Sequence, residues 1–166
     1  MTCRRHITFL CVLVLLAYPS HLLPDEPFAP WAKLTPEGAS ASQQQKIPTK
    51  AEVGIPAYPN AYIISLAAME DKKIGKTLNI IHMVSPDSPE VILSFYKEKL
   101  MAIEGWKWDE IFEAFHTGED YTKAMSQLNP FVEIVAVSLN TEDLKYVDPS
   151  LKETLKSRIQ IAYNPK

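Results

Sequence analysis

The chain has little cysteine, and its placement limits the chemistry open to the rest of the molecule. Only two of the 166 residues are cysteine, Cys3 and Cys11, and both lie close to the N-terminus. If this leader is removed during export, no thiol remains. The rest of the chain then has no disulfide, no thiol nucleophile and no thiolate metal site.

An excess of positive charge is also lacking. The formal net charge is −3, and it becomes −5 when the two leader arginines, Arg4 and Arg5, are lost. Binding to nucleic acid or to anionic lipid usually needs a basic surface. We therefore predict no nucleic-acid partner, and membrane contact only if the N-terminal segment is retained.

Signatures of catalysis and of cofactor binding are missing as well. The sequence has no His-Glu-x-x-His, no Cys-x-x-Cys-His and no glycine-rich phosphate loop. None of its serines lies in a nucleophile elbow. We therefore predict no enzymatic activity, no catalytic residues and no cofactor, and a hydrolytic enzyme is the least supported function.

The N-terminus has the order of a secretory signal peptide. Arg4, Arg5 and His6 precede an apolar segment over residues 7–18, and Pro19 ends it. This segment is too short to span a bilayer core, which needs roughly 20 residues. We predict that residues 1–23 are a signal peptide, and that the protein is exported to the periplasm or to the outer face of a membrane.

Two alternatives to a cleaved leader remain open. A retained N-terminal anchor would extend the apolar segment to Leu22 and Leu23, and lipidation would use Cys11. The cleavage site is not clean, because bulky Tyr18 lies two residues before the small residue Ser20.

Residues 24–50 are predicted to be a flexible, proline-rich linker. The prolines of this segment are Pro24, Pro27, Pro30, Pro36 and Pro48. Residues 38–45 are small and polar, and no apolar period is present. Phe28 and Trp31 are exceptions, which either dock on the domain or form a short adhesive motif. The folded domain is predicted to span residues 51–166.

That domain has the pattern of a small α+β fold. Apolar alternation predicts a hairpin followed by three further strands, at residues 62–68, 77–84, 106–115, 131–139 and 158–163. Ser88 and Pro89 predict the start of a helix over residues 89–104, with Ile92 and Phe95 in its apolar stripe. We expect a single antiparallel sheet of about five strands (ββαβββ), covered on one face by one long amphipathic helix.

A motif pattern in this region resembles small exported bacterial domains of uncharacterised function. In that pattern a Pro-x-Tyr-Pro-x-Ala segment leads into a hairpin, and a helix opens with Ser-Pro-Glu, carries Phe-Tyr-Lys and ends in Gly-Trp. The matching residues are Pro56, Tyr58, Pro59, Ala61, Ser88, Pro89, Glu90, Phe95, Tyr96, Lys97, Gly105 and Trp106. The resemblance covers residues 54–108 and implies a structural or binding module, with no reaction attached.

The titratable residues are assigned structural or solvated roles. His82 is expected to be a structural histidine on a strand face. His116 lies near Glu119 and Asp120 in sequence, but the spacing of a calcium-binding loop is missing. One strand carries three carboxylates that are expected to be solvated: Asp109, Glu110 and Glu113. We predict no metal site.

Three aromatic residues are expected to lie close together. Trp106 and Trp108 share a strand face, and Tyr96 lies on the helix that precedes them. They belong to the core, or they form an aromatic platform for a sugar, lipid or peptide.

Residues 117–130 and 141–156 exceed a minimal sheet-and-helix plan. In the second segment, Asp148, Pro149 and Ser150 are suited to open a short helix over Leu151 and Leu155. Binding residues concentrate on loops that a rigid scaffold holds. The candidate partner-binding residues are Tyr121, Met125, Leu128, Leu144 and Tyr146. The alternative is that these side chains only pin long loops to the sheet.

These patterns predict an exported, non-catalytic interaction domain. Its expected role is an accessory or structural subunit of an envelope or periplasmic protein assembly, with another envelope or membrane protein as partner. The alternative function is a periplasmic carrier of a small molecule or lipid, with its pocket between helix and sheet.

Overall fold

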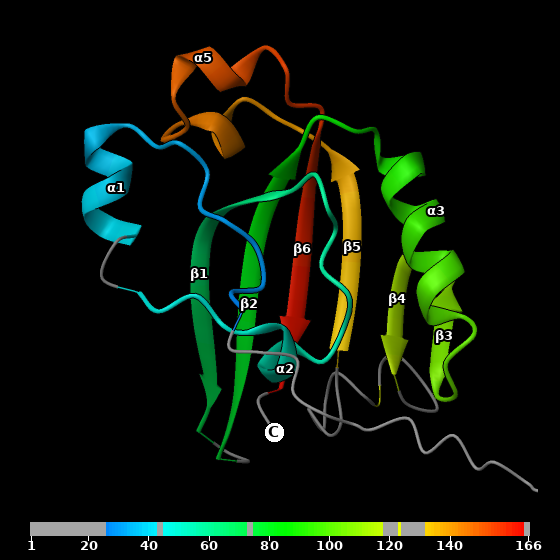
Figure 1. The fold of residues 1–166 in the computed structure, drawn as a ribbon. Helices are drawn as coiled ribbons and strands as arrows, with labels where there is room; N and C mark the ends of the chain where they lie inside the picture. The colour runs from blue at the N-terminus through cyan, green and yellow to red at the C-terminus, as the bar shows by residue number, and fades with distance from the viewer. Residues whose placement is uncertain (1–25, 43–44, 73–74, 118–122, 124–131, 165–166) are drawn as a thin grey trace, which may run out of the picture.

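The fold is built on one antiparallel sheet. The computed structural model of the chain describes residues 26–42, 45–72, 75–117, 123 and 132–164. Six strands lie in the order β1-β2-β6-β5-β4-β3, and all neighbours are antiparallel. Their bounds are β1 Tyr62–Asp71, β2 Lys76–Ser85, β3 Trp106–Asp109, β4 Ala114–Thr117, β5 Val132–Ser138 and β6 Ser157–Tyr163. In Figure 1, short helices lie in front of the sheet and above it.

β1 and β2 form the hairpin that the sequence predicts, and both strands are longer than predicted. From Leu66, which lies opposite Ile81, the register continues without a break to Asp71. An irregularity between Ile63 and Ser65 marks the first part of β1.

The sheet has six strands because residues 106–115 do not form a single strand. The carboxylate of Asp109 accepts hydrogen bonds from the backbone N–H groups of Ile111 and Phe112, at 2.8 and 2.9 Å. Glu113 has a positive φ of 48°. An aspartate that binds the backbone two residues ahead closes a tight turn. The prediction of one strand is therefore wrong, and β3 and β4 are a hairpin.

Helix α3, Pro89–Leu100, begins where the sequence predicts and ends before the predicted residue 104. Ile92, Tyr96 and Leu100 are fully buried, and Phe95 is half-buried. Ile103 is 50% exposed, so the apolar pattern beyond Leu100 does not reflect packing.

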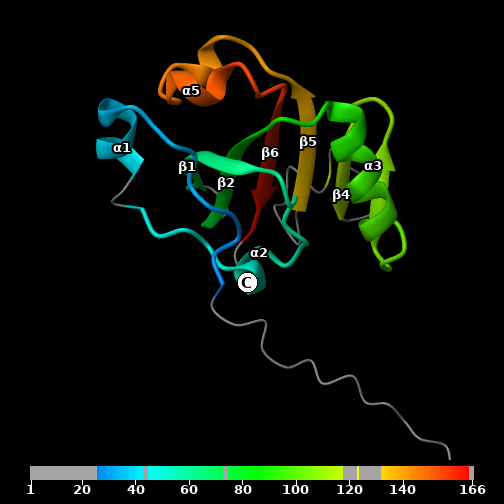
Figure 2. The same ribbon diagram turned by 45° about the horizontal axis from the view of Figure 1, so that its top comes forward.

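α3 covers only part of one face of the sheet. In Figures 1 and 2, α3 lies beside β4 and β5, and residues 26–33 and 45–61 pass in front of β1, β2 and β6. One core joins the two covers to the sheet. Its members include Phe28, Ile55, Tyr58, Ile63, Ile81, Met83, Ile92, Tyr96, Phe115, Ile134, Ile159 and Ile161. The cover expected from one long helix is thus shared with the N-terminal segment.

The described part of the predicted linker is packed against the sheet. Phe28 is 1% exposed and belongs to the core, and Trp31 packs against that core. A short helix, α1 (Pro36–Ser42), follows. Prolines fix an extended path here without preventing packing, so the flexible-linker expectation does not hold for these residues. Docking of Phe28 and Trp31, the alternative, is what the structure shows.

The segment 141–156 forms a cap over one end of the sheet, as Figure 2 shows. It contains η1 (Glu142–Leu144) and α5 (Pro149–Lys152). Asp148 caps α5 by accepting a hydrogen bond from the backbone N–H of Ser150 at 2.9 Å. The short helix predicted after Asp148 is therefore present.

No helix among the described residues is long and apolar enough to cross a bilayer. The predicted signal peptide, residues 1–23, lies outside these residues, and the predicted domain limits stay predictions.

Phe28→Ala should lower the free energy of unfolding by about 3–5 kcal/mol, because a large buried side chain is lost from the core. Urea denaturation measures this cost. Val91→Ala is the control, since Val91 is 52% exposed and should cost less than about 0.5 kcal/mol. A cost below about 1 kcal/mol for Phe28→Ala would show that the N-terminal segment does not pack as described.

Candidate functional site

An apolar groove lies between residues 27–30 and residues 50–59, and we call it the proline groove. Its volume is about 860 Å³. It is lined by Pro27, Phe28, Ala29, Pro30, Lys50, Ala51, Gly54, Ile55, Pro56, Ala57, Tyr58 and Pro59. Prolines stiffen the backbone on both sides of the groove. Binding a partner there should therefore cost the backbone little conformational entropy.

Backbone hydrogen bonds hold the first wall in place. The N–H of Phe28 donates to the carbonyl of Pro48 at 2.8 Å, and the N–H of Lys50 donates to the carbonyl of Glu26 at 3.2 Å. Lys50 Nζ also lies 2.8 Å from Glu26 Oε2. Exposed ion pairs contribute at most about 1 kcal/mol, so the buried Phe28 ring is the stronger anchor.

The second wall begins with a one-turn helix, α2 (Lys50–Val53). Thr49 Oγ1 accepts from the N–H of Glu52 at 3.2 Å, and Glu52 Oε2 accepts from the N–H of Thr49 at 2.6 Å. This reciprocal capping box fixes the start of the turn. The hydrogen bond from the Thr49 backbone is the main cause that lowers the pKa of Glu52. Gly54 ends the turn with a φ of 76°, which favours glycine.

Tyr58 ties this second wall to the sheet. Its hydroxyl donates to Asp87 Oδ2 at 2.8 Å, and Asn60 Nδ2 donates to the same oxygen at 3.2 Å. The Tyr58 ring meets the Phe95 ring edge-on, with 5.1 Å between centroids. Burial, reinforced by the Asp87 carboxylate, raises the pKa of Tyr58 to about 12. The phenol therefore stays protonated and donates at neutral pH.

The chemistry of the proline groove is that of a binding surface. Its lining is apolar apart from Lys50, whose charge Glu26 balances. Within the described residues, no group of three or more His, Cys, Asp or Glu side chains is placed to hold a metal ion. The sequence did not predict the groove, because the composition of residues 24–50 is typical of a linker. The recurrence of Pro and aromatic residues at 27–31 and 56–59 is the signal that could have found it.

The candidate partner-binding residues of the two long loops lie in different surroundings. Tyr121, Met125 and Leu128 lie outside the described residues. Leu144 is half-buried and packs against the cluster of Val84, Val147 and Leu155 in the cap. Leu144 therefore holds its loop against the rest of the fold, which is the alternative to partner binding.

Tyr146 is 48% exposed and touches α1. Its carbonyl accepts a hydrogen bond from the N–H of Thr35 at 2.8 Å. A Cβ on Gly38 would come within 2.6 Å of Tyr146 Cβ, so α1 can approach this closely only at a glycine. About half of the Tyr146 surface is exposed, and Lys145 Nζ lies 5.1 Å from the centre of its ring.

The aromatic platform is only partly assembled. Tyr96 is fully buried. Trp106 and Trp108 are half-buried and pack against the core, with the Trp108 ring 4.7 Å from the Phe115 ring between centroids. Tyr96 is therefore a core residue, and only the two tryptophans have surface to offer a ligand.

The histidines and carboxylates are placed as structural groups. His82 is half-buried on a strand face, and burial, followed by the charge of Arg158, lowers its pKa. His116 is 3% exposed, while Glu119 and Asp120 lie outside the described residues. Asp109 closes the β3–β4 turn.

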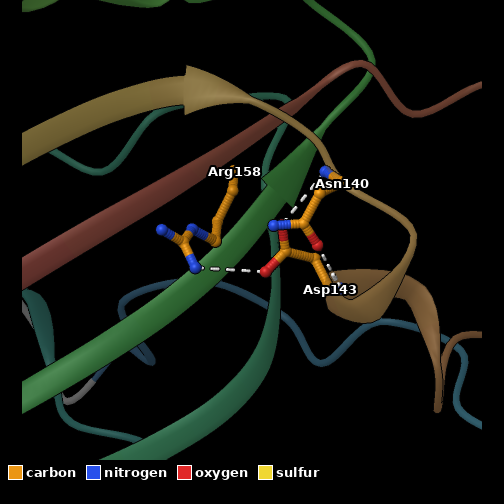
Figure 3. Close-up of polar contacts among 3 residues, drawn as sticks. All are labelled: Asn140, Asp143 and Arg158. Carbon is orange, nitrogen blue, oxygen red and sulfur yellow. Dashed lines mark hydrogen bonds and ion pairs between the residues drawn. The ribbon is translucent and has the colours of Figure 1, made fainter.

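A polar brace joins the cap to β6 (Figure 3). Arg158 Nη1 donates to Asp143 Oδ1 at 3.1 Å. The N–H of Asn140 donates to Asp143 Oδ2 at 3.2 Å, and the N–H of Asp143 donates to Asn140 Oδ1 at 3.0 Å. Because Asp143 balances the Arg158 charge and closes the turn before η1, we assign this cluster a structural role.

A second cavity, of about 310 Å³, lies where residues 45–52 cross β1, β2 and β6. Its lining mixes polar and apolar side chains, among them Lys46, Glu52, Leu66, Asn79, Ile81 and Tyr163. Both cavities thus lie against the N-terminal segment, away from the interface between α3 and the sheet.

No family model matches this chain, and no curated protein or solved structure matches it either. The resemblance to small exported bacterial domains therefore stays an expectation that rests on the motifs.

Tyr58→Phe should reduce the loss of stability at high pH. An unfolded tyrosine titrates near pH 10, whereas Tyr58 in the folded protein titrates at about 12. The unfolded chain therefore loses this proton first, and the free energy of unfolding falls as the pH rises from about 10 to about 12. Burial also raises the pKa of Tyr163, so part of the fall should persist in the variant. Urea denaturation across this pH range measures the effect, and equal slopes for both proteins would contradict the assignment.

Proposed function

We propose that the chain is an exported, non-catalytic interaction domain that acts as an accessory or structural subunit of an envelope or periplasmic protein assembly. The proline groove carries this proposal, because it is a preformed groove of about 860 Å³ along which Pro27, Pro30, Ala51 and Pro59 are exposed. Apolar grooves with such exposed residues commonly mark sites of protein interaction. The leader, with its basic start and apolar segment, supports export.

The groove fits an extended apolar segment of another envelope protein. Its charged residue, Lys50, is already paired with Glu26 and needs no acidic partner. Its stiff proline walls lose little conformational freedom on binding. Tyr58 is 5% exposed, and its hydroxyl donates to Asp87, so it supports the floor of the groove without leaving a polar group unsatisfied.

A carrier of a small molecule or lipid is the second candidate. The cavity of about 310 Å³ favours it, since carrier pockets combine apolar walls with a few polar groups. Lys46 and Glu52 would meet a polar headgroup there, and Leu66 and Ile81 would meet an apolar tail.

Ala51→Glu should reduce recovery of the partner at least tenfold when the full chain is purified from native membranes and its companions are quantified by mass spectrometry. Ala51 is exposed and lines the groove, so the new carboxylate would lose its water when a partner binds. Ala102→Glu is the matched control, because Ala102 is also exposed but does not line the groove.

Equal recovery with both variants would remove the groove as the interface. Tyr146→Ala then tests the cap, where that ring is accessible. Analysis of bound lipids and small molecules in the same preparations decides between the two functions. A stoichiometric small molecule with no protein partner would favour the carrier.

A further inference from the structure

The cavity of about 310 Å³ has an apolar end and a polar end. Its floor is the sheet face that carries the core, and residues 45–52 form its roof. Leu66 of β1 lies opposite Ile81 of β2, and both are part of the core packing. Two residues from Ile81, Asn79 lies opposite Tyr163 of β6. The apolar part of the floor is therefore continuous with the core, whereas Asn79 and the Tyr163 hydroxyl make the other end polar.

The polar end contains both hydrogen-bond donors and acceptors. A hydrogen bond joins the side chain of Asn79 to the Tyr163 hydroxyl. Burial raises the pKa of Tyr163, so its phenol is protonated at neutral pH and can donate. The Glu52 carboxylate lies close enough to contribute to the same rise. Glu52 therefore belongs to the polar end, together with Asn79 and Tyr163.

Glu52 is fixed by the backbone and only loosely paired with Lys46. Its Oε2 accepts from the N–H of Thr49 at 2.6 Å. Its Oε1 lies 3.8 Å from Lys46 Nζ, which is too far for a hydrogen bond. The side chains of Lys46 and Glu52 are 81% and 50% exposed, so a ligand can reach both charges. No hydrogen bond between the two has to break first.

These two charges limit the net charge that a ligand can carry. Among the described residues that line the cavity, Lys46 and Glu52 are the charged ones, and their charges cancel. A fatty acid would bring its carboxylate beside Glu52, and an aliphatic amine would bring its ammonium beside Lys46, and like charges repel. A head that carries both an ammonium and an anionic group complements both side chains.

We propose that this cavity binds a zwitterionic amphiphile with a short apolar tail. Its ammonium lies against Glu52, and its anionic group lies against Lys46 and accepts from the Tyr163 hydroxyl. Its tail lies over Leu66 and Ile81. The tail is short because about 310 Å³ is at the lower end of the range for ligand pockets. This inference rests on the second candidate function, the carrier, and is independent of the proline groove.

Three probes that share an isobutyl tail test the head of the ligand. Leucine carries an ammonium and a carboxylate, isocaproate lacks the ammonium, and isoamylamine lacks the carboxylate. In calorimetric titration of the full chain, leucine should bind about tenfold or more tightly than either analogue, because each analogue leaves one charge of the site unpaired. Dihexanoyl phosphatidylethanolamine has the same zwitterionic chemistry, and its binding in place of leucine would identify the ligand as a lipid.

Glu52→Gln separates recognition from folding. Glutamine can keep the hydrogen bond from the Thr49 N–H, but it offers no charge to the ammonium. Leucine binding should weaken about tenfold, and the preference should shift to isocaproate, because the Lys46 charge is then unbalanced. Glu37→Gln is the matched control, since Glu37 is exposed and does not line the cavity, and it should leave all affinities unchanged.

Equal binding of the three isobutyl probes, or preference for isocaproate or isoamylamine by the native chain, would overturn the zwitterionic head and leave the carrier function in place. Failure of all four probes to bind would also overturn the inference. The carrier function is then decided by the small molecules found in native preparations, and the proline groove by the Ala51→Glu comparison.

Discussion

The fold depends on the packing of the N-terminal segment onto the part of the α3-bearing sheet face that α3 itself leaves uncovered. Phe28 is the anchor of this contact, and it shares one core with α3 and with the central strands. Two hydrogen bonds to Ile63 attach the same segment to the edge of β1. Without this cover, apolar side chains of β1, β2 and β6 would face water.

The candidate site is a product of the same contact. The proline groove exists because residues 27–30 pass alongside α2 and the stretch that leads into β1. The second cavity lies under residues 45–52, farther along the same segment. This segment has the composition of a flexible linker. It nevertheless completes the core beside α3 and lines both the proline groove and the second cavity.

Local patterns in the sequence predicted the parts of the fold that local physics decides. The β1–β2 hairpin, the start of α3 at Pro89 and the short helix after Asp148 follow from alternation and capping. The β3–β4 turn was missed because the backbone bonds of Asp109 compete with an otherwise good strand pattern. The groove was missed because the burial of Phe28 depends on residues far along the chain. The pattern of apolar residues within 24–50 does not reveal contacts with residues that are distant in the sequence.

Hydrogen exchange of the full chain, followed by NMR, tests the central claim most directly. The amides to compare are those of Phe28 and Ala32, which bond to the carbonyls of Pro48 and Ile63, and that of Ile161 in the central strand β6. If the N-terminal segment is part of the core, Phe28 and Ala32 should open with nearly the same free energy as Ile161. Fast exchange at Phe28 and Ala32 while Ile161 stays protected would show that the segment is a detachable tether, and would contradict this account.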